Sequence, residues 1–420
     1  MTQNYDYLDY FRAVPKTGVI YVLEKAYEQG YSPTDIKWVN LGQGAPDTSP
    51  LNGDPETFNL SVNANNSEYA PVSGDINFRK KIASYYNDVF RRNKKSKYSY
   101  KNVCISGGGR VALSRLVAAM GNINLGHFIP DYTAYEELLS IFRNFVPIPI
   151  NLKKENNFKI SITELRTEIV NKGLSALLIS NPCNPTGQSL QGKELNEWVE
   201  LMNELRCLCI FDEFYSHFLY NNNTESKILS AAEYIDDVNG DPIVIINGMS
   251  KNWRSPGWRI GWMLAPESII DKVSSVGSFF DGGAVHPLQE ASLDKINPGT
   301  IKKEAKLLQD TFSKKRDYFV KRVLDMGIQL ECEPDSTFYL WCNLSKLPDP
   351  LTNCLTFFEE CLKENVIVVP GIFFDVNPGK RRLKQHSRYI TNIRLSYGPK
   401  MSSLKIGLDS LERVIKKFSQ

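Results

Sequence analysis

The stretch that decides the fold lies near the middle of the chain and reads Ala176-Leu177-Leu178-Ile179-Ser180, then Asn181-Pro182-Cys183-Asn184-Pro185-Thr186-Gly187. The first part is a short apolar run, which is typical of a strand buried on both faces of a sheet. The two Asn-Pro steps force extended or turn geometry, so the side chain of Asn184 can be held rigidly at the sheet edge. A turn with no further function would have the same sequence pattern. The neighbouring stretches must therefore show whether Asn184 belongs to a binding site or only to a turn.

The same pattern recurs on either side of this stretch. Apolar strands are expected at 103–105, 207–211 and 243–246, and the stretches between them are long enough for helices. Such a succession predicts an α/β fold with a largely parallel central sheet and helices on its faces. Upstream, residues 20–27 have the apolar spacing of a helix, and Gly30 lies where a helix-capping glycine is expected.

The pattern changes near residue 300. Residues 300–326 have the length of one long amphipathic helix, without a turn signal before Gly327. We therefore expect a large domain at 48–297 and a smaller α+β domain formed by both chain ends, 1–47 and 298–420. The small domain is expected to contain strands at 336–342, 366–369 and 391–396 and helices at 354–364 and 401–418.

The composition excludes several classes of protein. The 420 residues are 42% hydrophobic and 23% charged, which excludes disordered and collagen-like chains. The 50 basic and 47 acidic residues give a net charge of +3, too balanced to indicate a nucleic-acid or membrane partner. Eight scattered cysteines and four histidines argue against a metal site, and we expect the cysteines to be buried reduced thiols. Residues 1–10 lack a basic and apolar leader, so we expect a cytoplasmic protein.

Two more strand ends carry groups that can bind ligands. A glycine-rich turn, residues 106–109, follows the 103–105 strand and leads into a helix near Arg110. The free amides of such a turn form an anion site, although a tight turn alone would look similar. Asp212 and Tyr215 follow the strand expected at 207–211. A lone aspartate at the end of a strand is usually a helix cap.

A lysine completes the set. Residues 247–262 follow an apolar strand and place Lys251 among small and aromatic residues. Partial burial would lower the pKa of this amine and favour Schiff-base chemistry, whereas a lone lysine would be a surface residue. Lys251, the glycine-rich turn, Asp212, Asn184 and a second cation at Arg259 together form a set of groups that could bind a phosphorylated pyridine aldehyde.

With these motifs, the sequence resembles the fold-type I pyridoxal-phosphate enzymes, specifically the class I/II aminotransferases with the aspartate aminotransferase-like fold. The resemblance extends from Leu41 to Gly398, and the Asn-Pro-Thr-Gly, Asp-Glu-Phe-Tyr and Ser-Lys-x7-Arg-x-Gly motifs occur in family order. It implies pyridoxal 5'-phosphate as the cofactor. It also implies an aminotransferase that moves an amino group between an α-amino acid and a 2-oxo acid through an aldimine at Lys251.

The resemblance assigns roles to the residues around the ring of this cofactor. Lys251 is implied as the catalytic residue that holds the cofactor and moves the α-proton. Asp212 is implied to pair with the protonated ring nitrogen, which keeps the ring a good electron sink. Asn184 and Tyr215 are implied to hydrogen-bond the phenolic oxygen, and Tyr132 to stack on the ring.

The resemblance also assigns the substrate carboxylate and the cofactor phosphate. Arg394, whose guanidinium suits a bidentate contact, is implied to bind the α-carboxylate together with Asn184 and the backbone of Gly44. Tyr69 resembles a tyrosine that reaches the phosphate of the neighbouring subunit, which implies a homodimer. The other implied phosphate contacts are Gly108, Gly109, Arg110, Ser250 and Arg259.

Three stretches depart from the family pattern. Gly248 stands where many relatives have a serine or threonine, three residues before the lysine, and residues 281–284 lack a hydroxyl side chain that many relatives carry. The connection 370–394 is longer than in compact relatives and contains a basic run, 379–388. We expect this run to be a solvated loop, with anion binding as the alternative.

Two other functions compete with amino transfer. The same fold could catalyse β- or γ-elimination, cyclisation or decarboxylation, because loop residues decide which bond at the α-carbon breaks. A ligand-sensing regulator would need a helix-turn-helix module before the enzyme-like part, yet only about 40 residues precede Gly44 and none forms a basic recognition helix. The sequence leaves the substrate side chain undefined.

Overall fold

The protein contains a seven-stranded central sheet with the strand order β2-β8-β7-β6-β5-β3-β4. The structure is a computed structural model, which describes residues 14, 16, 18–51, 67–142, 144–220 and 227–419. Neighbouring strands pair in parallel except where β8 pairs with β2 and β7. The predicted α/β class with a mostly parallel sheet is thus confirmed. The strands are β2 (Val103–Ser106), β3 (Asn124–Ile129), β4 (Val146–Asn151), β5 (Ala176–Ser180), β6 (Leu208–Asp212), β7 (Ile243–Gly248) and β8 (Gly261–Leu264).

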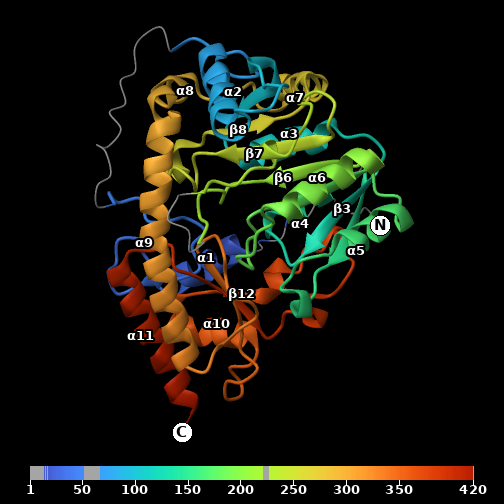
Figure 1. The fold of residues 1–420 in the computed structure, drawn as a ribbon. Coiled ribbons are helices and arrows are strands. Elements are labelled where there is room, and N and C mark those ends of the chain that lie inside the picture. Colours follow the sequence, from blue (N-terminus) through green and yellow to red (C-terminus); the bar gives the residue numbers. More distant parts are fainter. Residues whose placement is uncertain are drawn as a thin grey trace, which may run out of the picture.

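Helices cover both faces of this sheet, as Figure 1 shows. Successive strand residues point to opposite faces, so Ile210 packs in one hydrophobic cluster and Phe211 in the other. Because both faces are covered, every residue of β5 and β7 is buried. One cluster includes α3 (Gly109–Ala119), α4 (Ala134–Ile141) and α7 (Glu267–Phe280), and the other includes α2 (Ile76–Phe90), α5 (Ile162–Asn171) and α6 (Lys193–Leu205).

One long helix joins the two parts of the molecule. The helix predicted at 300–326 is α9, Pro298–Asp325, which follows the short α8, His286–Ala291. Figure 1 shows α9 running from the level of the large sheet down to the C-terminal helix α11, Met401–Phe418. Asn297 caps its amino end by accepting hydrogen bonds from two backbone amides, and Gly327 ends it with a positive φ.

The smaller part has two sheets, and it corrects two sequence expectations. The expected strand at 336–342 begins only at Tyr339, and the expected strand at 366–369 is two short strands in different sheets. The first strand begins late because Thr337 has a φ of +64°, which interrupts the extended backbone; the second error arises because an apolar run does not mark where the chain leaves a sheet. The elements are α1 (Val19–Glu28), β1 (Val39–Asn40), β9 (Gln329–Leu330), β10 (Tyr339–Asn343), α10 (Cys354–Lys363), β11 (Val366–Ile367), β12 (Val369–Pro370) and β13 (Asn392–Ser396), with sheet orders β1-β11 and β12-β13-β10-β9.

Both chain ends contribute to this smaller part. The helix predicted at 20–27 is α1, and Gly30 ends it in the predicted manner, with the amide of Tyr31 bonded to the carbonyl of Ala26 at 2.9 Å. Because β1 pairs with β11, the N-terminal segment joins the C-terminal lobe. We therefore propose the division into 48–297 and 1–47 with 298–420. Residues 1–13, 15, 17, 52–66, 143, 221–226 and 420 of that division lie outside the described residues, and with them the stretch 1–10 on which the cytoplasmic expectation is based.

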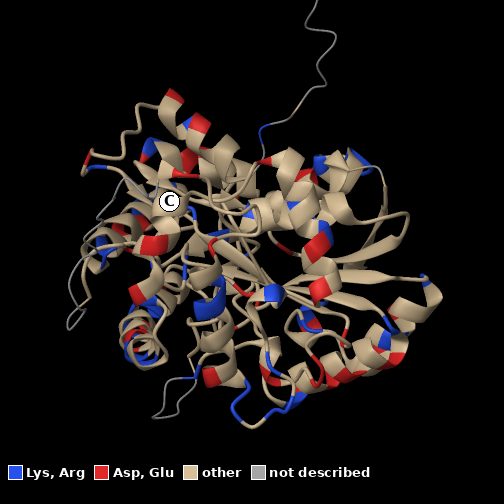
Figure 2. Cartoon of the chain, turned by 90° about the horizontal axis from the view of Figure 1, so that it is seen from above, with Lys and Arg blue, Asp and Glu red and all other residues tan. Residues whose placement is uncertain are grey.

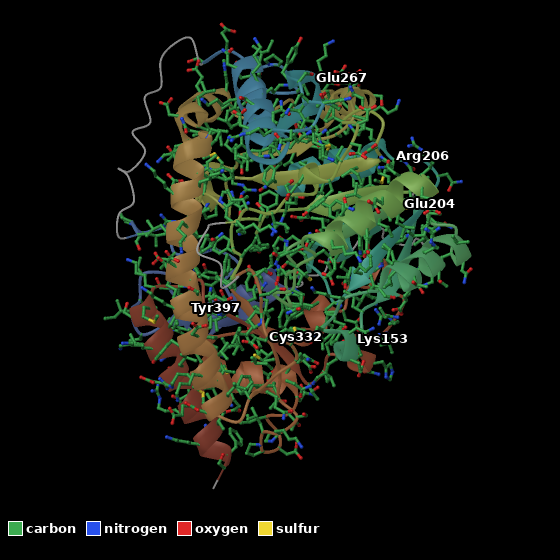
Figure 3. The ribbon with its side chains drawn as sticks, viewed as in Figure 1. Lys153, Glu204, Arg206, Glu267, Cys332 and Tyr397 are labelled. Atoms are coloured by element: carbon green, nitrogen blue, oxygen red, sulfur yellow. The ribbon has the colours of Figure 1, made fainter. Side chains whose placement is uncertain are left out.

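The surface and the cysteines agree with the composition. Figure 2 shows lysines and arginines interspersed with acidic residues over the fold. No helix within the described ranges is long and apolar enough to cross a membrane. All eight cysteines are free thiols and seven of them are buried, as predicted; Cys183 is half-buried. Figure 3 shows one of the buried ones, Cys332, in the small lobe with Tyr397.

Candidate active site

The polar residues identified from the sequence gather at the carboxyl ends of the parallel strands. Tyr132 follows β3, Asn184 follows β5, Asp212 ends β6 and Lys251 follows β7. Parallel strands end at the same sheet edge, where open α/β sheets bind their ligands. Residues that are far apart in the sequence therefore meet in one site.

Lys251 is a half-buried lysine whose ionisation is shifted towards the reactive free amine. Its pKa is lowered to about 8, first because burial disfavours the charged amine and then because Arg110, Arg394 and Arg259 lie nearby. Asp212 opposes this shift with a smaller effect. A substantial fraction of free amine is consequently present near neutral pH, and the free amine is the form that attacks a carbonyl.

Asp212 is a buried carboxylate, 6% exposed, at the end of β6. Its Oδ2 accepts a hydrogen bond from the hydroxyl of Tyr135 at 2.7 Å. Burial raises the pKa of Asp212 to about 6, and the bond from Tyr135 limits that rise. Sequence reasoning missed Tyr135, although its position three residues after Tyr132, in the stretch that follows β3, is a signal that could have identified it.

Arg394 and Asn184 form a buried pair. Arg394, 1% exposed, donates from Nη1 to Oδ1 of Asn184 at 2.8 Å and from Nη2 to the carbonyl of Gly42 at 2.6 Å. Its Nε is buried and has no hydrogen-bond partner among the residues that the structure describes. An unpaired buried donor is costly, which indicates a ligand that supplies an acceptor. The resemblance assigned the backbone of Gly44 to the substrate carboxylate, and in this structure the carbonyl of Gly44 accepts a hydrogen bond from Lys251.

Two aromatic rings pack against the Arg394 guanidinium. Its central carbon lies 4.2 Å from the ring centroid of Tyr339 and 5.0 Å from that of Phe374. The hydroxyl of Tyr339 is 2.8 Å from the hydroxyl of Tyr215, so Tyr215 is connected to the arginine through Tyr339. Sequence reasoning missed Tyr339 because an aromatic residue in an apolar strand is ordinarily part of the core.

The glycine-rich turn forms the end of the site that suits an anion. Gly108 has a φ of +95° and precedes the first residue of α3. A Cβ on Gly108 would lie 2.3 Å from Nη2 of Arg259, and a Cβ on Gly109 would lie 2.3 Å from the ring of Phe214. Gly108 therefore lets the guanidinium of Arg259 lie against the amino end of α3, where free amides attract anions, and Gly109 leaves room for the ring of Phe214.

The other residues assigned to the phosphate have different surroundings. Arg110 donates to the hydroxyl of Tyr132 at 2.8 and 3.2 Å. Ser250 is buried beside Lys251 in the chain. Tyr69 is 96% exposed, so its ring does not pack against its own chain.

The two departures near the phosphate end have structural reasons. A Cβ on Gly248 would lie 2.5 Å from the carbonyl oxygen of Ile260 and 2.8 Å from Cα of Gly261. Both are backbone atoms, so a serine or threonine does not fit there unless the chain moves. In the 281–284 stretch, Asp281 forms an ion pair with the buried Arg115 of α3, which anchors the stretch to the large domain.

The basic run is only partly the solvated loop that we expected. Residues 383–386 are exposed, but Lys380 forms ion pairs with Glu136 and Glu137 of α4. Arg382 likewise pairs with Asp375 at 2.6 Å. These two cations already have protein partners, which disfavours the anion-binding alternative for them.

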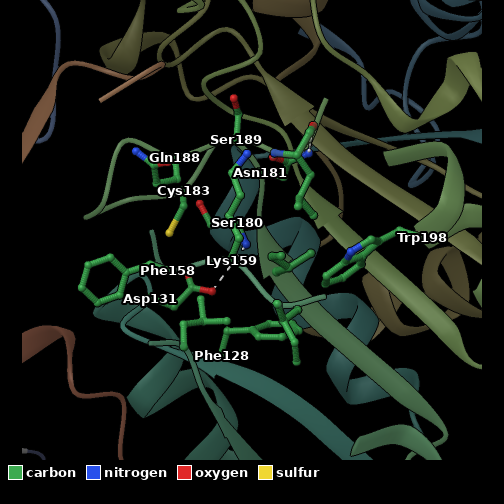
Figure 4. Close-up of a pocket in the computed structure, with 14 residues that line it drawn as sticks. Phe128, Asp131, Phe158, Lys159, Ser180, Asn181, Cys183, Gln188, Ser189 and Trp198 are labelled. Carbon is green, nitrogen blue, oxygen red and sulfur yellow. Dashed lines mark hydrogen bonds between the residues drawn. The ribbon is translucent and has the colours of Figure 1, made fainter. Parts of the chain in front are cut away.

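A cavity of about 30 Å³ lies behind the turn that follows β5, and Figure 4 shows its lining. The backbone amide of Ser180 lies 3.5 Å from Oδ2 of Asp131, the buried carboxylate in its wall. The volume is enough for about two water molecules, so this is not the substrate site. Within the described ranges, no three His, Cys, Asp or Glu side chains lie close enough to hold a metal ion.

The site fits the cofactor that the resemblance implies. Lys251 suits an aldehyde, Asp212 suits a protonated ring nitrogen, and Arg259 with the amino end of α3 suits a phosphate. Pyridoxal 5'-phosphate carries all three groups. The unpaired Nε of Arg394 remains for a further anionic ligand.

Comparisons with known proteins agree with this chemistry. The family described as aminotransferase class I and II matches residues 36–410. The chain is 25% identical over 379 residues to a probable aspartate/prephenate aminotransferase of Aquifex aeolicus, covering 89% of this chain and 93% of that one. It is 26% identical over 392 residues to an aspartate aminotransferase of Sulfolobus acidocaldarius, covering 91% of each chain. The structure of Thermus thermophilus aspartate aminotransferase with maleate has the same fold, with a TM-score of 0.78 at 22% identity, over 96% of this chain and 100% of that chain.

Proposed function

This chain belongs to the aminotransferases of class I and II, and on that premise we propose that Lys251 is the residue through which it transfers an amino group from an α-amino acid to a 2-oxo acid. One observation carries this proposal. The half-buried Lys251, with a pKa of about 8, shares one sheet edge with the buried Asp212, and the Nε of the buried Arg394 has no partner among the described residues. Amine, carboxylate and guanidinium are the three groups that this transfer requires.

Each residue of the site can be given a separate role in this reaction. Pyridoxal 5'-phosphate, when bound, supplies an aldehyde for the amino group and a ring that withdraws electrons from the α-carbon. Lys251 would hold the aldehyde carbon and carry the α-proton, because its free amine is both nucleophile and base. Asp212 would keep the ring nitrogen protonated, and Arg259 with Gly108 would hold the phosphate.

We propose an acidic amino donor, with aspartate as the first to test. The relatives described above are named for aspartate. Arg110, Arg259 and Arg394 all lower the pKa of Lys251, but they are assigned to the cofactor phosphate and to the α-carboxylate, so the choice of aspartate is based on the names of these relatives.

The half-reaction distinguishes amino transfer from the competing reactions. The loaded protein is incubated with L-aspartate and no 2-oxo acid, while absorbance and products are followed. We expect one equivalent of 2-oxo acid per site and complete conversion of the cofactor to its amine form. Sustained release of ammonia, pyruvate or carbon dioxide would instead show elimination or decarboxylation.

Replacing Arg394 with lysine should lower kcat/KM for every amino donor by about 100-fold, mostly through KM. Lysine keeps one charge but loses the planar fork that now contacts Asn184 and Gly42 and leaves Nε free. Steady-state kinetics with aspartate measure the effect. The exposed Arg388 offers a matched control, since Arg388→Lys should leave both constants unchanged; an unchanged KM in the Arg394 variant would refute the carboxylate role.

We further propose a homodimer in which Tyr69 serves the site of the neighbouring subunit. A tyrosine that is 96% exposed in the single chain leaves a large apolar ring in water. Phe279 and Val285, at 77% and 54%, are also exposed, and His286 lies within 3.0 Å of the carbonyl oxygen of Glu68, which connects the two regions. The exposed side chains of Tyr69, Phe279 and Val285 support an interface between two copies of this chain in this region.

A further inference from the structure

Tyr135 is a fully buried tyrosine that no step of the proposed reaction uses directly. It lies in the first turn of α4, and its hydroxyl donates to Oδ2 of Asp212 at 2.7 Å. The other hydrogen bond to this carboxylate is a long one, from the backbone amide of Phe214 to Oδ1 at 3.5 Å. Among the described residues, Tyr135 is therefore the side chain that fixes the orientation of Asp212.

The charges around Asp212 make this contact important. Lys251 favours the ionised form of Asp212, and, in addition to burial, the charge of Asp212 in turn raises the pKa of the buried carboxyl groups of Asp131 and Glu213. Burial raises the pKa of both neighbours, Asp131 well above its usual value and Glu213 to about 8. Asp212 thus has to ionise in a buried environment, where the neutral form is favoured, while its two acidic neighbours stay protonated more readily than usual.

We propose that Tyr135 is a positioning residue that keeps Asp212 ionised and aimed at the cofactor ring nitrogen; this inference rests on the proposed function. A hydrogen bond donated to a carboxylate stabilises its charged form without adding a charge to the site. Burial raises the pKa of Tyr135 well above its ordinary value, so the hydroxyl keeps its proton at every working pH. The donor is therefore constant while Asp212 titrates.

Binding of pyridoxamine 5'-phosphate to the cofactor-free chain tests this role without any turnover. This probe has no aldehyde and forms no bond with Lys251, so its affinity reports recognition of the ring and the phosphate. Dissociation constants are measured by quenching of tryptophan fluorescence from about pH 5 to about pH 9, for the wild type, Tyr135→Phe and a control. Tyr397→Phe is a matched control, because Tyr397 is fully buried and its hydroxyl donates to the carbonyl of Thr337 at 3.3 Å in the small lobe.

The result expected is a pH-dependent loss of affinity. Without the hydroxyl, the pKa of Asp212 should rise by about one unit, so Tyr135→Phe should bind about tenfold more weakly at about pH 5 and almost normally at about pH 9. The control should bind like the wild type throughout. A loss that is equal at every pH would show a merely structural role and overturn the inference, as would an unchanged affinity.

A double mutant keeps the inference testable if the single change disturbs packing. In an Asp212→Asn background, Tyr135→Phe should have no further effect on affinity, because the group through which it acts is gone. A full additional loss there would overturn the inference. Absence of probe binding to the wild type would overturn the proposed function as well. If the wild type binds the probe but the ratio of the Tyr135→Phe and wild-type dissociation constants does not change with pH, only this inference is overturned.

Discussion

Replacing Lys251 with alanine should lower the rate of amino transfer by about 10⁴ and abolish the imine absorbance of the loaded protein. The expected loss is large because one amine holds the aldehyde carbon and also moves the proton. Steady-state rates and absorbance spectra measure it. Retained absorbance together with turnover of amino donors would contradict the assignment.

A buried lysine outside the site provides the control. Lys315 is 4% exposed and its pKa is also lowered to about 8, but its Nζ donates to the carbonyl of Pro399 at 2.7 Å, near Asp47. A low pKa alone therefore does not identify the reactive amine. Borohydride reduction of the loaded protein, followed by peptide mapping, should label Lys251 and leave Lys315 unlabelled.

The Lys251 variant also tests the homodimer. If Tyr69 serves the neighbouring site, mixing Lys251→Ala with Tyr69→Ala subunits should produce hybrids with one intact site each. Activity in the mixture should then exceed that of either parent alone. A mixture no more active than its parents, after subunit exchange has been shown, would refute the shared site.

Replacing Asp212 with asparagine should lower kcat by about 10²–10³ while the fold is kept. Asparagine has nearly the same shape and can accept the hydrogen bond of Tyr135, but it carries no charge to hold the ring nitrogen protonated. Near-normal turnover would exclude the electron-sink role. Rates are measured at saturating cofactor, so that weaker cofactor binding is not mistaken for slower chemistry.

The same variant should be more stable than the wild type when both lack cofactor. The folded pKa of Asp212, about 6, is higher than the unfolded value, so the folded state binds more protons between these two values. The contribution of this group to stability is therefore fully present below the unfolded pKa and is lost as pH rises to about 6. At neutral pH the buried charge costs about 3 kcal/mol, which asparagine removes. Unfolding curves at about pH 5 and about pH 8 measure the change, and equal effects at both would contradict it.

Most of the fold could be predicted because its signals are local. The apolar runs of β5 and β7 are short and bounded by polar turns, and a strand–helix succession has few solutions other than a parallel sheet. The strand expected at 366–369 was wrong because four consecutive buried residues carry no sign that the chain changes sheets at Val368. Burial makes residues apolar in either sheet, so composition cannot locate such a bend.

The sequence by itself determined the fold class, the long helix α9 and the set of chemical groups at the strand ends, because periodicity and turn residues are local properties of the chain. Only the tertiary structure decided how these groups pair. It joins Asn184 to Arg394, Tyr215 to Tyr339 and Asp212 to Tyr135, across separations that no spacing rule covers. It also decided the ionisation of Lys251 and Asp212, since burial and neighbouring charge, which shift a pKa, exist only once the chain has folded.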